Sequence, residues 1–175
     1  MSFSDHARKY EAWREEARAR TQATMYNLAM NLEVPLEAAR MDLINITPHA
    51  LDEAEAEGWE LPWIDIVGQI RPYLRRFTVA IWFEGKLYGL GSGRASRGKQ
   101  NVTIHYVERR ANPNPFAGWV ALMVVDAAEN YGKILGSQVL RIRNPVPGVI
   151  KRYERLGFSL AETYRGATYY ERKIA

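Results

Sequence analysis

The chain contains the stretch Lys151-Arg152-Tyr153-Glu154-Arg155-Leu156-Gly157-Phe158, in which the order of residue types indicates a helix followed by a strand. Residues 147–156 have a helical pattern that stops at Gly157, and glycine commonly ends helices. Phe158 then opens a strand over residues 158–162, and a last strand follows over residues 167–173. The end of the chain is therefore predicted to be a helix leading into two strands.

The segment before this stretch predicts a strand–helix–strand unit. Residues 101–108 and 138–143 alternate apolar and polar side chains, which is typical of strands. A strongly apolar helix over residues 118–133 lies between them, and Gly136 ends it. Because strands joined through a helix run parallel within one sheet, we expect one parallel crossover here.

A hairpin precedes this unit. Residues 77–83 are β-branched and aromatic, Glu84-Gly85 supplies a tight turn, and residues 86–93 return. The glycines of the second strand, Gly89, Gly91 and Gly93, resemble a nucleotide-binding turn, but neither a helix nor a Lys-Ser/Thr pair follows them. They favour a bulge or a close approach by another element.

The N-terminal part predicts mostly helix. The expected elements are a long helix over residues 4–32 capped by Ser4 or Asp5, a short helical turn over 36–40, a strand over 41–46, a helix capped by Thr47 that stops at Gly58, and a helix over 62–75 interrupted by Gly68 and Pro72. We therefore predict a helical extension, residues 1–40, on a mixed α/β domain, residues 41–175.

A narrow apolar stripe runs along the first predicted helix. Its members are Tyr10, Trp13, Ala17, Met25, Leu28 and Leu32. The stripe either packs on the body of the domain, which is the favoured alternative, or forms a docking face for a protein partner or a second copy of the chain.

Composition excludes several classes of protein. With 175 residues, 47% hydrophobic and 25% charged, the chain is long enough for one folded domain and is neither disordered nor collagen-like. It has no cysteine, and its three histidines are far apart, so we expect no metal site. No apolar stretch is long enough to span a membrane, and no signal peptide is evident, which predicts a cytoplasmic protein.

Charge is divided unevenly along the chain. Residues 1–70 carry a net charge of −7 and residues 71–175 carry +11. Such a basic segment suggests an anionic partner, either nucleic acid or a phosphate-rich small molecule, unless the two halves pair with each other. No nucleic-acid-binding motif accompanies the basic residues, so nucleic acid is not the expected partner.

The element order, together with Asn144 and the Tyr-Glu-x-Leu-Gly-Phe-like stretch at 153–158, resembles the GNAT superfamily of N-acetyltransferases. Ile46-Thr47-Pro48 and the acidic helix after it resemble the first strand and helix of that family. The resemblance covers about residues 41–173. It implies a mixed α/β sheet in which the two central strands, residues 101–108 and 138–143, splay apart to hold acyl-CoA.

The family's phosphate-binding loop corresponds to residues 109–119, where this chain departs from the glycine-rich pattern. Pro113 and Pro115 have no N–H group to donate, so the donors would come from residues 116–119 and from the side chains of Arg109 and Arg110. A purely structural turn with solvated arginines is the alternative. The implied cofactor-binding residues are Tyr106, Val107, Arg109, Arg110, Phe116, Ala117, Gly118, Trp119 and Asn144.

The resemblance also implies catalytic roles. Tyr153 occupies the position of the family's tyrosine that protonates the departing thiolate, although a core tyrosine is the alternative. Glu108 and His105 are candidates for the base that deprotonates the amine; alternation puts them on opposite faces of the strand, so only one faces the cleft, and Glu108 is preferred. Asn144 either contacts the cofactor or caps the next helix.

The predicted function is transfer of an acetyl or other acyl group from acyl-CoA to an amine whose identity the sequence does not reveal. The alternative is a GNAT-fold protein that has lost catalysis and serves as a structural or interaction component, for example in a phage or mobile-element assembly. The irregular loop and the additional N-terminal helix motivate that alternative.

Overall fold

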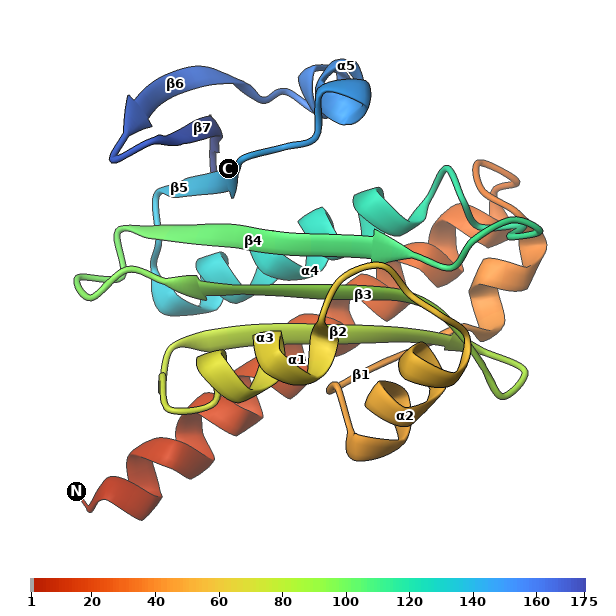
Figure 1. Ribbon diagram of the computed structural model, residues 1–175, viewed down its shortest axis with the longest axis horizontal. Helices are drawn as coiled ribbons and strands as arrows, with labels where there is room; N and C mark the ends of the chain where they lie inside the picture. The colour runs from red at the N-terminus through yellow and green to blue at the C-terminus, as the bar shows by residue number, and fades with distance from the viewer. Residues whose placement is uncertain (1) are drawn as a thin grey trace.

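The computed structural model describes residues 2–175 and shows a seven-stranded sheet with helices on both faces (Figure 1). The strands lie in the order β1-β2-β3-β4-β5-β7-β6, and all neighbours are antiparallel except β4 and β5. The strands are β1 (Asp42–Ile44), β2 (Arg76–Phe83), β3 (Lys86–Ala95), β4 (Asn101–Arg109), β5 (Val139–Arg143), β6 (Ser159–Tyr164) and β7 (Ala167–Lys173). The mixed sheet and its single parallel crossover confirm the predicted fold class.

Helices separate onto the two faces of this sheet. They are α1 (Phe3–Met30), α2 (Pro48–Ala56), α3 (Trp63–Ile70), α4 (Val120–Leu135) and α5 (Ile150–Arg155), with 3₁₀ turns at Leu36–Arg40 and Pro147–Val149. In Figure 1, α2 and α3 lie on the viewer's side of the sheet, and α1 and α4 lie behind it. None of the helices is long and apolar enough to cross a membrane over the part of the chain that the structure describes.

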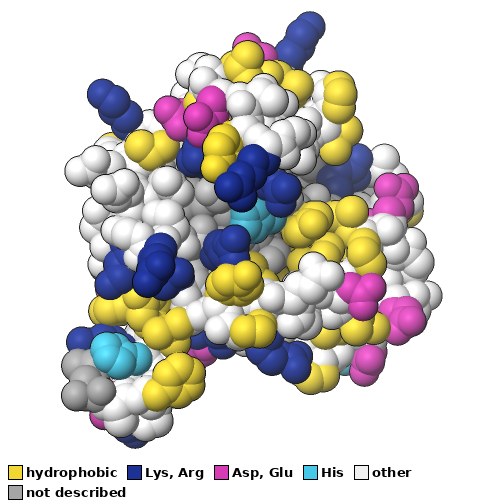
Figure 2. Space-filling view, turned by 60° about the vertical axis from the view of Figure 1, so that its left-hand side comes forward, with side chains coloured by type: hydrophobic (Ala, Val, Ile, Leu, Met, Phe, Trp, Pro, Cys, Tyr) yellow, Lys and Arg dark blue, Asp and Glu magenta, His cyan; other side chains and the backbone are white. Residues whose placement is uncertain are grey.

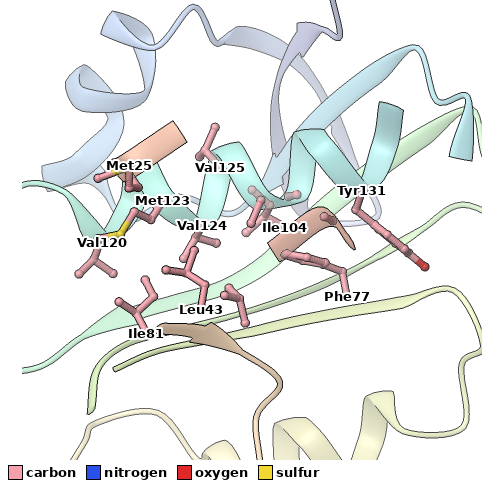
Figure 3. Close-up of a cluster of buried hydrophobic side chains, with 14 of the residues drawn as sticks. Met25, Leu43, Phe77, Ile81, Ile104, Val120, Met123, Val124, Val125 and Tyr131 are labelled. Atoms are coloured by element: carbon pink, nitrogen blue, oxygen red, sulfur yellow. The ribbon is translucent and has the colours of Figure 1, made fainter. Parts of the chain in front are cut away.

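The larger core lies between α4 and the sheet. Figure 3 shows Val120 and Val124 of α4 pointing toward Ile81 of β2, with Met25 of α1 beside them. A second core cluster on the other face contains Trp63 of α3 and Trp82 of β2. One layer of side chains on each face thus fixes the sheet between its helices.

The glycines of β3 allow two close approaches. A Cβ atom at Gly91 would lie 2.5 Å from Cγ1 of Val124 on α4, and one at Gly93 would lie 2.1 Å from the carbonyl oxygen of Thr103 on β4. Gly93 also sits where the register of β3 and β4 shifts. Both expectations for these glycines, a bulge and a close approach, are confirmed.

The long helix α1 packs on the body of the domain. Tyr10, Ala17 and Met25 of the predicted stripe are buried in the larger core, and Trp13 and Leu28 are partly buried against it. Leu32 is 80% exposed, because the helix ends at Met30. The packing alternative is therefore the one observed, and α1 shares one core with the sheet.

Some predicted boundaries were wrong. The N-cap of α1 is Ser2, whose side chain forms a capping box with Asp5, rather than Ser4 or Asp5. The helix expected to reach residue 75 ends at Ile70, where Arg71 and Pro72 form a turn. The caps at Thr47 and Gly136 are as predicted.

Candidate functional site

The strands β4 and β5 part halfway along β4. They pair only from Asn101–Val139 to Ile104–Ile142, whereas β4 continues alongside β3 as far as Arg109. Residues 105–109 therefore have a free edge on the side where β5 would continue. This is the splay that the resemblance implied, and it leaves backbone N–H and C=O groups of β4 without strand partners.

A cavity of about 340 Å³ fills the opening between the two strands. It is lined by residues of β4, of the start of α4, of the segment after β5 and of α5; these are Leu61, Ile104, His105, Tyr106, Val107, Arg109, Ala117, Val120, Ala121, Ile142, Arg143, Asn144, Pro145, Val146, Val149, Arg152 and Tyr153. The lining is apolar apart from its arginines, His105, Asn144 and two tyrosines, which suits a ligand with an aliphatic arm and a few polar groups.

His105 lies at a bulge in β4. Ser92 pairs with Tyr106 and the next residue, Gly93, pairs with Ile104, so His105 has no partner on β3. The bulge breaks the alternation on which the sequence argument relied, and both His105 and Tyr106 line the cavity. Of the two candidate bases, of which only one was expected to face the cleft, His105 lines the cavity and Glu108 does not.

His105 is held in its neutral form. Burial, followed by the positive charges of Arg94 and Arg143, lowers the pKa of His105 to about 4. Its imidazole makes no hydrogen bond to any group of residues 2–175. At neutral pH the ring therefore presents an unprotonated nitrogen.

Tyr153 of α5 also lines the cavity. Its side chain is 5% exposed and packs edge-on against Phe158. Burial raises the pKa of Tyr153. The phenol is therefore protonated across the neutral range and can donate a proton or a hydrogen bond toward the cavity.

Asn144 does not cap a helix. Its backbone N–H donates to the carbonyl of Thr168 (2.7 Å), and its Oδ1 accepts from the N–H of Thr168 (2.8 Å). The capping alternative is therefore not what the structure shows, because these bonds hold Asn144 to β7 at the end of the β5–β7 ladder. Asn144 lines the cavity, and its Nδ2 donates to no group in residues 2–175.

The loop before α4 uses most of the donors that sequence analysis expected to be free. The N–H of Phe116 donates to Oδ1 of Asn114, that of Ala117 to the carbonyl of Asn114, and that of Trp119 to the carbonyl of Phe116. The expectation of four free donors at 116–119 was wrong, because Asn114 and the turn itself supply acceptors. Within residues 2–175, the N–H groups that lack an acceptor at this helix start are those of Gly118, Ala121 and Leu122.

The two adjacent arginines of this loop differ. Arg110 pairs with Glu57 at 2.8 Å, donates to the carbonyl of Leu87 and lies over the ring of Tyr88, so it ties the end of β4 to α2 and β3. It does not line the cavity. Arg109 lines the cavity and forms no ion pair with any carboxylate of the described residues.

Glu108 lies outside the cavity lining. Its carboxylate accepts hydrogen bonds from the N–H of Glu60 (2.7 Å), the N–H of Leu61 (3.0 Å) and Nε1 of Trp63 (2.8 Å). Glu108 therefore fastens the connection between α2 and α3 to β4. Phe116, Gly118 and Trp119, which were expected to bind the cofactor, also lie outside the lining.

Among the residues that line the cavity without having been singled out in the sequence, the charged ones are Arg143 and Arg152. Arg143 follows the last residue of β5 that pairs with β4, and Arg152 precedes Tyr153 on α5. Neither forms an ion pair among residues 2–175. In Figure 2, Lys and Arg side chains gather around a histidine beside an apolar hollow. No group of three or more potential metal ligands occurs in the described part of the chain.

Comparison with known proteins identifies the fold. No protein-family model matches the chain, and no curated protein matches its sequence. Among solved structures, Ard1 from Thermoplasma volcanium matches with a TM-score of 0.60 and 13% identity over 78% of this chain and 99% of that chain. An acetyltransferase from Thermus thermophilus matches with a TM-score of 0.58 and 17% identity, over 76% of this chain and 96% of that chain. A Bacillus subtilis acetyltransferase in complex with CoA matches with a TM-score of 0.55 and 18% identity, over 78% of this chain and 99% of that chain. The chain has the GNAT fold.

Proposed function

We propose that this GNAT-fold chain is an N-acyltransferase that moves an acetyl or other acyl group from acyl-CoA to an amine. The observation that carries the proposal is the parting of β4 from β5 after the Ile104–Ile142 pair, with a cavity of about 340 Å³ in the opening. A strand edge with unpaired backbone groups beside an apolar cavity suits an aliphatic arm that contains amides.

The chain's free polar groups fit such a donor substrate. Arg110 N–H donates to Tyr88 on β3, so by alternation the backbone groups of Val107 and Arg109 point to the open edge, where they would bind the amides of the pantetheine arm. The N–H groups of Gly118, Ala121 and Leu122 at the start of α4, with the guanidinium of Arg109, would bind its phosphates.

Tyr153 is the proposed acid. As the amine nitrogen bonds to the thioester carbon and the C–S bond breaks, Tyr153 donates its phenolic proton to the departing sulfur. Burial raises the pKa of Tyr153, which keeps that proton in place until the thiolate forms.

His105 is the proposed base. Its neutral imidazole lines the cavity and takes a proton from the amine, whereas Glu108 already accepts three hydrogen bonds outside the lining. A base must first lie within reach of the proton, and on that criterion His105 is preferred over Glu108. This assignment differs from the preference for Glu108 in the sequence analysis.

Calorimetric titration with acetyl-CoA and desulfo-CoA tests the proposal directly. We expect binding of both, followed by thiol release from acetyl-CoA when amines are supplied. If neither ligand binds at millimolar concentration, the proposed transferase function is wrong and the alternative, a structural protein, remains. Removing α1 would not distinguish a transferase from a structural protein, because α1 contributes to the larger core and its loss would affect folding in either case.

A further inference from the structure

Two arginines flank His105 on the neighbouring strands. On β3, Arg94 pairs with Thr103 of β4, two residues before His105. On β5, Arg143 follows the Ile142–Ile104 pair and lies at the level of His105, where β4 and β5 part. Both act on His105 as positive charges. We call Arg94, His105 and Arg143 the basic triplet.

Neither arginine of the basic triplet is neutralised. Arg94 stacks on the ring of Tyr73 at 4.1 Å, and Arg143 is exposed; neither forms an ion pair with any carboxylate in residues 2–175. Arg141, two residues before Arg143, provides the contrast, because it pairs with both Glu162 and Glu171. Arg141 is thus neutralised, whereas Arg143, which lines the cavity, and Arg94, which lies on β3 outside the lining, have no carboxylate partner among residues 2–175.

The cavity contains no compensating acid. None of the described residues that line it is Asp or Glu, and Glu108 is turned to the α2–α3 connection. Two guanidinium groups held near a neutral imidazole repel each other and attract an anion, which guanidinium binds through paired hydrogen bonds.

We propose that Arg94 and Arg143 bind an anionic group, a carboxylate or phosphate, on the acceptor amine. The inference rests on the proposed acyl transfer and adds the chemical class of the acceptor: an amine that carries a negative charge close to the reacting nitrogen. Arg109, Arg152 and the start of α4 remain available for the phosphates of the donor.

Binding of such an acceptor would also prepare the base. Burial and the two arginines lower the pKa of His105, and the charges that face it come from β3 and β5. An anion between the arginines offsets their field, so the pKa of His105 rises toward its usual value when the acceptor is bound. His105 would then be a stronger base in the complex than in the free protein.

The test uses amines that differ only in charge: an amino acid and its amide, and phosphoethanolamine and ethanolamine. With acetyl-CoA and the full chain, we expect kcat/KM to be about tenfold to a hundredfold higher for the charged member of at least one pair. Whichever pair shows the preference identifies the anion as carboxylate or phosphate. Arg94→Gln and Arg143→Gln should each reduce that preference at least severalfold, by raising KM for the charged amine.

Arg97→Gln is the matched control, because it removes the same charge from the exposed β3–β4 connection outside the cavity lining. Equal use of charged and uncharged amines, or an equal loss in Arg97→Gln, would overturn the proposal. Calorimetry with N-acetyl amino acids and their amides tests the same site without turnover. Binding of the charged product together with no binding of acetyl-CoA would reject only the transferase proposal, whereas acetyl-CoA binding without charge preference would reject only the anionic acceptor.

Discussion

Arg18 of α1 donates a hydrogen bond from Nη1 to the backbone carbonyl of Thr78 on β2 at 2.8 Å, with its side chain 3% exposed. Arg14, one helical turn earlier, donates to the carbonyls of Leu74 and Arg76. The spacings agree, because four residues of helix rise about 6 Å and two residues of strand about 6.6 Å. Since β1 pairs only with Ala80–Trp82, α1 satisfies the part of the β2 edge that no strand reaches.

Replacing Arg18 should therefore destabilise the fold. Arg18→Met leaves the Thr78 carbonyl without its partner, and we expect a loss of about 1–3 kcal/mol in the free energy of unfolding by urea. Arg20→Met is the control, because Arg20 pairs with Glu16 on the solvent side, and an exposed pair contributes less than about 1 kcal/mol. Equal losses in both variants would contradict a structural role for α1 at this edge.

Gly91 and Gly68 should respond oppositely to alanine. A Cβ at position 91 meets Val124 at 2.5 Å, so Gly91→Ala should separate α4 from β3 and destabilise the chain by about 1–3 kcal/mol. Gly68 lies inside α3 with open space around it, and Gly68→Ala should stabilise by about 0.5–1 kcal/mol through helix propensity. Thermal unfolding of the two variants measures both signs.

The variant Glu108→Gln tests whether Glu108 anchors the connection between α2 and α3 or acts as the base. Glutamine keeps one acceptor oxygen for three N–H donors, so we expect lower stability and a raised KM for the amine with kcat nearly retained. Full stability together with a kcat reduced by about a hundredfold or more would instead restore Glu108 as the base.

Tyr153→Phe should lower kcat while acetyl-CoA still binds. Removing the hydroxyl removes the proposed proton donor, for which a loss of about 10²–10⁴-fold is typical. The ring that packs on Phe158 is retained, so the melting temperature should change little. Unchanged kcat with saturating substrates would show that Tyr153 is a core residue only.

The titration of His105 should be visible by NMR. The pKa of His105 is lowered to about 4 from 6.5, so the folded protein binds its proton less well than the unfolded chain does. The contribution of neutral His105 to the free energy of unfolding is complete above about pH 6.5 and is lost as the pH falls toward 4. Arg94→Gln and Arg143→Gln should each raise the pKa of His105, with part of the shift remaining because burial is its largest cause. A pKa that stays the same in both variants would contradict the charge arrangement around β4.

Local pattern was sufficient for most of the fold. Alternation, capping residues such as Thr47 and the glycine that ends α4 are properties of neighbouring residues, so the sequence alone indicated the element order and the parallel β4–β5 crossover. The resemblance then indicated that these strands part. Tyr153 and Asn144, expected from that resemblance, do line the cavity, whereas their chemical roles stay predictions.

Tertiary structure decided which charged groups are free. Glu108 and Arg110 looked available in the sequence, but partners in the connection between α2 and α3, about fifty residues away, bind them. Only strand pairing brings Arg94 and Arg143 near His105, which is the unpaired residue of the bulge in β4. Sequence spacing reports local geometry, whereas the balance of charges at a site depends on contacts between distant segments.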